Sequence, residues 1–212
     1  MISRTMLFCV LILVSTIYGS TSDGDFLIRA EVWHYATPPL PPDILSYDDG
    51  SPSWITWAGT YRAVWFGLSD FYTSPYPYNT QLFSSEMWFY HLSEFPWDTS
   101  EYSSELWSGD EGCPIGEIAS VSGIAQQYSA STCQFSEHPY VPEVFWIILN
   151  TEQSAGGWPS SISDGTQPFS GTDHSYFSND FIIWEPWTIQ GSTCYPMKLE
   201  SQSWGALKNL FN

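Results

Sequence analysis

The chain has very few basic residues. Its 212 residues include 5 Lys and Arg against 23 Asp and Glu, which gives a formal net charge of −18. A surface this acidic repels phosphate backbones and anionic lipid headgroups, so nucleic acid and membrane surfaces are disfavoured partners. It attracts divalent cations and basic proteins, and it is compatible with neutral polymers.

Recognisable catalytic and metal-binding motifs are also missing. The chain has no Gly-x-Ser-x-Gly nucleophile elbow, no glycine-rich phosphate loop and no Cys-x-x-Cys pair. Adjacent acids occur at Asp48/Asp49 and Asp110/Glu111, but a chain this rich in acids produces such pairs by chance. We therefore expect no catalytic residues and no cofactor, with calcium as the one candidate ion.

Long apolar runs are absent except near the N-terminus. Arg4 precedes the run Met6–Val14, and the small residues Gly19, Ser20 and Ser22 follow it. This layout predicts a secretory signal over residues 1–19, with cleavage as late as residue 22 or an uncleaved anchor as alternatives. We expect a secreted, extracellular or cell-surface protein without membrane insertion after cleavage.

Cysteines are few. Beyond the apolar N-terminal run there are three, Cys113, Cys133 and Cys194. In an oxidising compartment, one pair and one leftover thiol is the simplest count. Cys113 and Cys133 flank an apparent strand, and a disulfide between them would contribute roughly 3 kcal/mol. The alternative is three unpaired thiols.

Aromatic residues, in contrast, are abundant, with 12 Trp, 13 Tyr and 13 Phe. Short segments rich in aromatic and β-branched residues alternate with Gly, Pro, Ser and Asp, a pattern typical of sandwiches and barrels. Strands are expected at Phe26–Tyr35, Tyr61–Phe66, Glu86–His91, Tyr102–Trp107, Glu117–Ile124, Val144–Asn150, Tyr176–Trp184 in two pieces, and Thr193–Leu199. We predict an all-β fold, an antiparallel two-sheet β-sandwich over residues 20–199 with almost no helix.

Two of these segments also indicate burial. Val144–Leu149 is apolar at every position, which predicts a central strand covered on both faces. Around Tyr102 and Leu106, apolar and polar residues alternate, which predicts a half-buried strand with Glu101 and Glu105 on its other face.

The order of several short motifs resembles an accessory β-sandwich domain of predicted secreted bacterial surface proteins and proteases. The motifs begin with Tyr47-Asp48-Asp49-Gly50 and continue with Ala63–Phe66, Glu105–Trp107, Gly109–Gly112, Phe145–Ile147, Pro159…Asp164-Gly165 and Ser175–Phe177. The resemblance covers residues 45–199 and implies a non-catalytic, jelly-roll-like module. The chain departs from the pattern at the last strand, Tyr195–Leu199, where Met-Ile-Arg is usual.

The tail at residues 200–212 is a separate feature. Trp204, Leu207, Leu210 and Phe211 recur at roughly helical spacing. The segment resembles Trp-Gly-x-x-Lys endings of other exported bacterial proteins, which implies a sorting or docking peptide. The alternative is a terminal helix that packs on the sandwich or frays.

Two sets of side chains are candidates for binding. Four tryptophans in loop-like contexts offer flat faces that can stack on sugars, with packing inside the protein as the alternative: Trp54, Trp57, Trp158 and Trp187. Asp48 and Asp49 precede Gly50 in a turn where carboxylates can converge on calcium. The alternative there is an Asx-turn in which the side chain caps its own backbone.

Three classes of function follow. The first is a non-catalytic structural or binding module of the exported cell surface, with a polysaccharide or a cell-surface protein as partner. The second is a carbohydrate-binding module that uses exposed tryptophans. The third is a secreted glycoside hydrolase, which would need two of the loop acids about 5–10 Å apart.

Overall fold

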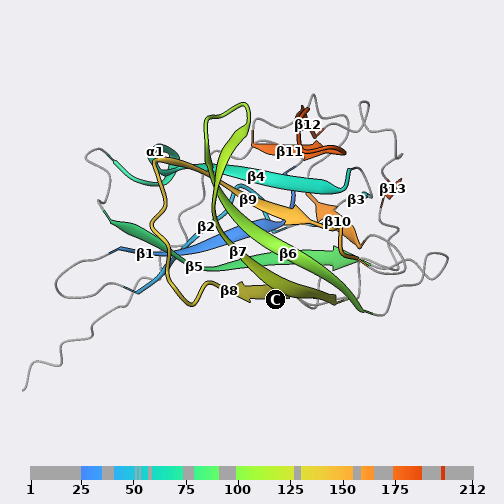
Figure 1. The fold of residues 1–212 in the computed structure, drawn as a ribbon, viewed down its shortest axis with the longest axis horizontal. Coiled ribbons are helices and arrows are strands. Elements are labelled where there is room, and N and C mark those ends of the chain that lie inside the picture. The colour runs from blue at the N-terminus through green and yellow to red at the C-terminus, as the bar shows by residue number, and fades with distance from the viewer. Residues whose placement is uncertain are drawn as a thin grey trace, which may run out of the picture.

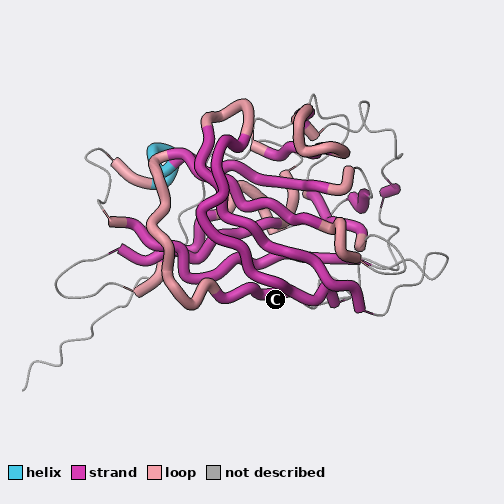
Figure 2. Tube along the Cα trace, in the orientation of Figure 1, coloured by secondary structure: helices cyan, strands magenta, loops and turns pink. Residues whose placement is uncertain are grey.

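The fold consists of two β-sheets packed face to face (Figure 1). The computed structural model describes residues 25–34, 41–50, 52, 54–56, 59–73, 79–90, 99–126, 130–154, 159–164, 174–187 and 197–198. Most of these residues lie in strands, and the one helix among them is the four-residue α1, Leu68–Phe71 (Figure 2). All strand pairs are antiparallel. The prediction of an all-β, antiparallel two-sheet sandwich is confirmed.

The first sheet is built around the long strand β5, Thr80–Tyr90. One side of β5 pairs with β1 (Ile28–His34) and β10 (Ser160–Ser163), and the other side pairs with β8 (Ala130–Gln134). Strand β2 (Asp43–Leu45) lies beyond β1, and β3 (Trp54–Thr56) and β13 (Met197–Lys198) lie beyond β10.

The second sheet has six strands. Their order is β12 (Glu185–Pro186), β11 (Ser175–Ser178), β4 (Tyr61–Gly67), β9 (Val144–Asn150), β6 (Thr99–Gly109) and β7 (Pro114–Gln126). Strand β9 lies between β4 and β6, and every residue from Phe145 to Leu149 is buried. The prediction that this apolar strand is central and covered on both faces is confirmed.

Contacts between the sheets form the main core. Strand β1 alternates buried and half-buried residues, as a strand with one inward face should. Phe89 of β5 packs against Tyr102 of β6, with ring centroids 5.2 Å apart. The buried hydroxyls of Ser85 and Ser104 lie 2.6 Å apart and join the same two strands by a hydrogen bond. The two sheets are therefore tied by both apolar and polar contacts.

A buried arginine adds a further tie between the sheets. Arg62 of β4 is fully buried, and its Nη1 donates to the carbonyl of Pro159 at 2.6 Å and to Ser161 Oγ at 2.8 Å. Its Nη2 donates to the carbonyl of Gly59 at 3.2 Å. These acceptors offset part of the cost of removing the guanidinium from water.

The outer face of the second sheet carries a second apolar cluster. Trp65 of β4 and Trp146 of β9 are buried there, although they lie on the side of the sheet away from the main core. Phe181 and Trp184, from the segment after β11, pack on this cluster. The segment therefore covers part of a sheet face that would otherwise meet water.

The segment after β11 is not the second strand piece predicted up to Trp184. Residues 179–184 form a turn because Asp180 Oδ1 accepts the backbone N–H groups of Ile182 at 2.8 Å and Ile183 at 3.0 Å. Phe181 adopts a positive φ of 64°, which no strand residue has. Local capping by a short polar side chain takes precedence here over the apolar composition.

The predicted Cys113–Cys133 disulfide is wrong. Both cysteines are free; Cys113 is exposed at the turn before β7, and Cys133 is buried on β8. A Cβ atom at Gly123 would lie 2.6 Å from Cys133 Sγ, so Cys133 sits beside the far half of β7. At about 3.3 Å per strand residue, the path along β7 places the two thiols far beyond bonding distance. Cys194 lies outside the described residues, as do the predicted signal and the tail at residues 200–212.

Candidate functional site

The turn Ser46–Gly50 connects four separate parts of the fold. Tyr47 points into the core, where its hydroxyl donates to Asp70 Oδ2 at 2.5 Å and accepts the N–H of Gly67 at 3.2 Å. Its ring stacks on His174 with centroids 3.5 Å apart. Burial, reinforced by the Asp70 carboxylate, raises the pKa of the Tyr47 hydroxyl well above its usual value. Tyr47 is therefore a neutral hydrogen-bond donor that anchors the turn.

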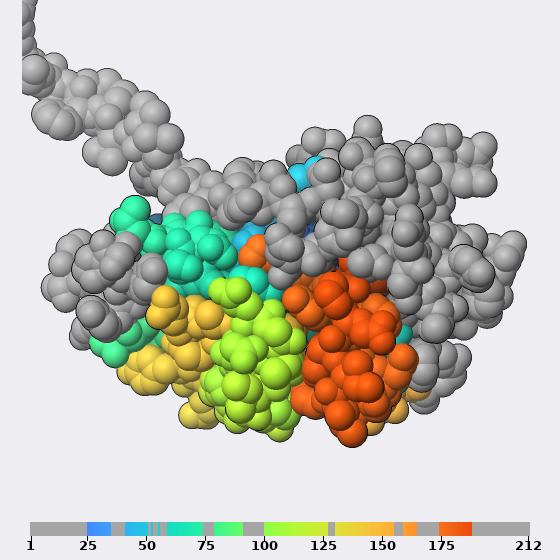
Figure 3. All heavy atoms as spheres, turned by 90° about the horizontal axis from the view of Figure 1, so that it is seen from above, coloured from blue at the N-terminus to red at the C-terminus, as the bar shows by residue number. Residues whose placement is uncertain are grey.

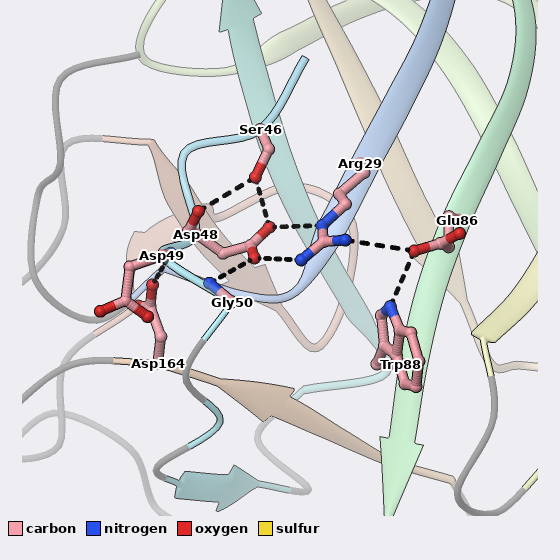
Figure 4. Close-up of polar contacts among 8 residues, drawn as sticks. All are labelled: Arg29, Ser46, Asp48, Asp49, Gly50, Glu86, Trp88 and Asp164. Carbon is pink, nitrogen blue, oxygen red and sulfur yellow. Dashed lines mark hydrogen bonds and ion pairs between the residues drawn. The ribbon is translucent and has the colours of Figure 1, made fainter. Parts of the chain in front are cut away.

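Asp48 holds the turn to the first sheet (Figure 4). Arg29 of β1 donates to it through two nitrogens, Nε to Oδ2 at 3.0 Å and Nη2 to Oδ1 at 2.7 Å. Ser46 Oγ donates to Oδ2 at 2.6 Å, and the N–H of Gly50 donates to Oδ1 at 3.0 Å. The buried carboxylate thus accepts four hydrogen bonds, which is close to its full capacity.

The Arg29 guanidinium also faces a second acid. Its Nη1 lies 3.5 Å from Glu86 Oε1 on β5, and the same oxygen accepts the indole N–H of Trp88 at 2.8 Å (Figure 4). Arg29 therefore links the turn to both β1 and β5. The predicted site did not include Arg29, although the position of one of the chain's few basic residues inside a predicted strand was a usable signal.

Asp49 contributes its backbone N–H to the turn. Its N–H donates to Asp164 Oδ2 at 2.6 Å, at the end of β10, while its own side chain is exposed. Burial raises the pKa of Asp164 to about 8, and the neighbouring acids Asp25, Asp48 and Asp49 act in the same direction. This shift favours the protonated, neutral form of Asp164 over the ionised form, although the hydrogen bond from Asp49 acts in the opposite direction.

A further buried acid lies next to Asp164. The N–H of Asp164 donates to the carbonyl of Asp25 at 3.0 Å. Asp25 Oδ1 accepts the hydroxyl of Ser175 at 2.7 Å, and Ser175 Oγ in turn accepts the N–H of Phe26 at 3.0 Å. The start of β1 is thus bonded to β10 and β11, one strand from each sheet.

The calcium prediction at Asp48 and Asp49 can be compared with this geometry. The hydrogen bond from Gly50 N–H to Asp48 Oδ1 is the Asx-turn that was the alternative, and Gly50 has the positive φ of 73° that such a turn favours. Among the described residues, no three His, Cys, Asp or Glu side chains form a group that could hold a metal ion. The oxygens of Asp48 are used by Arg29, Ser46 and Gly50.

The four candidate tryptophans are not brought together in the described structure. Trp187 is fully buried and stacks on Phe26 with centroids 5.2 Å apart, so it does not offer an exposed face. For Trp54 the structure describes only the backbone, in β3, while Trp57 and Trp158 lie outside the described residues.

A second polar cluster lies at the other end of β1. His34 Nδ1 is 3.0 Å from Thr80 Oγ1, and His34 Nε2 is 3.2 Å from Asp43 Oδ2, which also accepts the hydroxyl of Tyr72 at 3.0 Å. Burial lowers the pKa of His34, although Asp43 opposes this shift. A carboxylate, an imidazole and a hydroxyl in series can activate a nucleophile. Thr80 is only 2% exposed, however, so the hydroxyl is closed to a substrate.

Comparisons with known proteins return no relatives. No family model matches the chain, and no curated protein and no solved structure matches it. In the described part of the chain, no helix has the length and apolar character needed to cross a membrane.

Proposed function

We propose that the chain is an exported, non-catalytic binding module with a jelly-roll-like sandwich. In this proposal the signal segment directs the chain out of the cell, and the mature domain acts at the cell surface or in the medium. Its partner is a polysaccharide or a surface protein, and the sandwich serves as a rigid frame for the recognition surface.

The observation that carries the proposal is the internal use of the polar groups in the Ser46–Gly50 turn. The hydroxyl of Tyr47, the carboxylate of Asp48 and the N–H of Asp49 each bond to another part of the protein. Groups that are already bonded, buried and held in place are poorly suited to proton transfer or nucleophilic attack. They support a structural role for the motif that opens the domain.

A glycoside hydrolase is the second candidate, because one observation favours it. Asp164, whose pKa is raised, lies next to the exposed Asp49, and such enzymes use a carboxyl group of raised pKa as the general acid beside a second acidic side chain. The burial of Asp164, which is 2% exposed, argues against contact with a glycosidic oxygen.

One set of assays separates the candidates. The secreted chain is screened for binding on a glycan array and for turnover of polysaccharide, ester and peptide substrates. The proposal expects binding without turnover. Turnover that is lost in both Asp164→Asn and Asp49→Asn, and kept in the exposed control Glu137→Gln, would replace it with the hydrolase.

A further inference from the structure

Strand β7 has a free edge. It pairs with β6 on one side, and among the described residues no strand pairs with its other side. Only its far end is approached, where Ser131 Oγ of β8 donates to the carbonyl of Ile124 at 2.7 Å. With respect to the described strands, the stretch from Pro114 to Ser122 is therefore unpaired on this side for roughly 30 Å, at about 3.3 Å per residue.

The direction of the Ile124 carbonyl fixes which backbone groups face outward. In a strand, the N–H and C=O of alternate residues point to the same side. Because Ile124 directs its carbonyl away from β6, Ser122 and Ser120 present their N–H and C=O groups at the free edge. An extended segment laid along β7 would find these groups available for a new ladder.

The inner side of β7 offers small apolar side chains. Ala119 and Val121 pack against the main core but remain only partly buried. They lie opposite Leu106 and Ser104 of β6, which face the core. A strand added beside them would place its own inward side chains over the exposed margin of this core, and these side chains should therefore be apolar.

The outer side of β7 is acidic. Glu117 and Ser120 lie opposite Trp107 and Glu105 in the register, and Ile124 lies opposite Glu101. Glu101 and Glu117 are exposed. Side chains that an added strand directs to this face would therefore lie beside carboxylates.

Other acids enlarge this negative face. Burial is the largest cause of the raised pKa of the Tyr61 hydroxyl. The carboxylates around it raise this pKa further; they belong to Glu152, Glu105 and Asp180. Of the basic side chains that the structure describes, Arg29 is engaged by Asp48 on the first sheet and Arg62 is buried. An added strand would thus meet negative charge that no described cation of this face neutralises.

Two bulges in the β6–β7 pairing add apolar contacts at the same edge. Ile115 and Ile118 are the β7 residues that the register omits, and they are 69% and 39% exposed. Bulges commonly protect an edge from pairing. Here the omitted residues are isoleucines rather than the lysines that would repel another strand.

A neighbouring segment exposes further apolar side chains. Figure 3 shows the β6–β7 hairpin in green beside the segment around β11 and β12, and this segment exposes Ile182 and Ile183.

We propose that the free edge of β7 binds an extended segment of a partner protein in which basic and apolar residues alternate. The basic residues face Glu117 and the acids of the outer side, and the apolar residues cover Ala119 and Val121. The backbone of Ser120 and Ser122 provides the ladder. This assignment rests on the proposed binding function and gives it a partner class. A second copy of the chain fits less well, because each copy has a formal charge of −18.

The test uses three capped, fluorescent eight-residue peptides and fluorescence anisotropy. One alternates Lys and Val, the second has the same sequence with every backbone nitrogen methylated, so that it keeps the charge but donates no ladder hydrogen bond, and the third alternates Glu and Val. We expect the Lys-Val peptide to bind at one site and the other two to bind at least about tenfold more weakly. Equal binding of the N-methylated peptide would overturn the proposal, because charge alone would explain the affinity.

Variants locate the site on the full chain. Ser120→Pro removes an outward N–H without touching the β6 pairing and should weaken the Lys-Val peptide by about tenfold, whereas Ser120→Ala should not. Glu117→Lys should weaken it more than Glu137→Lys, an equal charge change at an exposed site outside β7. Circular dichroism checks that each variant is folded.

Three further results are decisive. Equal loss in the two lysine variants would overturn the proposal. So would a dimer in sedimentation that Ser120→Pro dissociates, because the edge would then bind a second copy. Failure of all peptides, with glycan binding intact, removes this inference and leaves the proposed function standing.

Discussion

Arg29 is the residue on which the Ser46–Gly50 turn depends most. Arg29→Met leaves the buried carboxylate of Asp48 without its charged partner, so we expect a loss of about 3 kcal/mol in the free energy of unfolding. Glu86→Gln removes only the longer and more exposed contact of Arg29 and should cost about 0.5 kcal/mol or less. Urea denaturation of both variants measures the difference. Equal losses would show that the bidentate pair is not what holds the turn.

Asp164 should make stability depend on pH. Its pKa rises from 3.8 in the unfolded chain to about 8 in the fold, so between these values the folded state binds more protons. The contribution of Asp164 to stability is therefore complete below pH 3.8 and is lost as the pH rises through about 8.

Asp164→Asn tests this dependence. The amide keeps an acceptor for the N–H of Asp49 and does not ionise, so the variant should gain stability relative to the wild type as the pH rises toward 8 to 9. The control Glu117→Gln, an exposed change, should follow the wild-type curve. Thermal melts between pH 5 and 9 provide the measurement, and a constant difference between wild type and Asp164→Asn would contradict it.

At the residue scale, sequence reasoning identified the turn but not its chemistry. Tyr47, Asp48, Asp49 and Gly50 were recognised as a unit, and the Asx-turn was one of two stated interpretations. Their partners could not be inferred, because Arg29 and Asp164 are distant in sequence and meet the turn only when β1 and β10 pair with β5. The burial of Trp187 likewise depends on contact with Phe26.

At the element scale, Gly123 shows how closely β7 packs. A Cβ atom there would lie 2.5 Å from Tyr102 Cζ and 2.6 Å from Cys133 Sγ. Gly123→Ala should therefore overpack the core and cost about 1–3 kcal/mol. At Gly116 the nearest atom is Ser108 Oγ at 3.2 Å, which needs to move only slightly and can keep its hydrogen bond to the carbonyl of Gly116, so Gly116→Ala should cost less. Chemical denaturation compares the two, and a larger loss at Gly116 would be contrary to this packing.

The strands that sequence reasoning found and missed differ in composition. Strand β9 was predicted with its observed bounds because an unbroken apolar run needs cover on both faces. Strands β8 (Ala130–Gln134) and β10 (Ser160–Ser163) were missed because they are made mostly of small polar residues. They form strands because each pairs with the backbone of β5, one on either side of it. Pairing between segments that are distant in sequence leaves little trace in the local sequence.

At the scale of the whole molecule, the net charge of −18 should oppose compaction. Sodium chloride screens this repulsion. Raising its concentration from about 0.01 M to 0.3 M should raise the Tm by roughly 2–4 °C, which is the shift that a gain of about 1 kcal/mol in stability produces in a chain of this size.

The calcium prediction can be tested in the same way. Because Asp48 is occupied by Arg29, calcium should raise the Tm no more than magnesium at equal concentration. A rise specific to calcium, reversed by EDTA, would support the calcium prediction at Asp48 and Asp49.

The bonds of the first strand to the last third of the chain also have a kinetic consequence. Phe26 reaches Ser175, 149 residues away, and Asp25 bonds to Asp164, so β1 cannot complete its contacts until β10 and β11 have been synthesised. Such non-local closure predicts slow refolding, in milliseconds to seconds, and a chain that stays open while it is being extended. If these bonds form after the transition state, Ser175→Ala should accelerate unfolding and leave the refolding rate unchanged. Stopped-flow tryptophan fluorescence would measure both rates, and a slower refolding of Ser175→Ala would place the closure of β1 early instead.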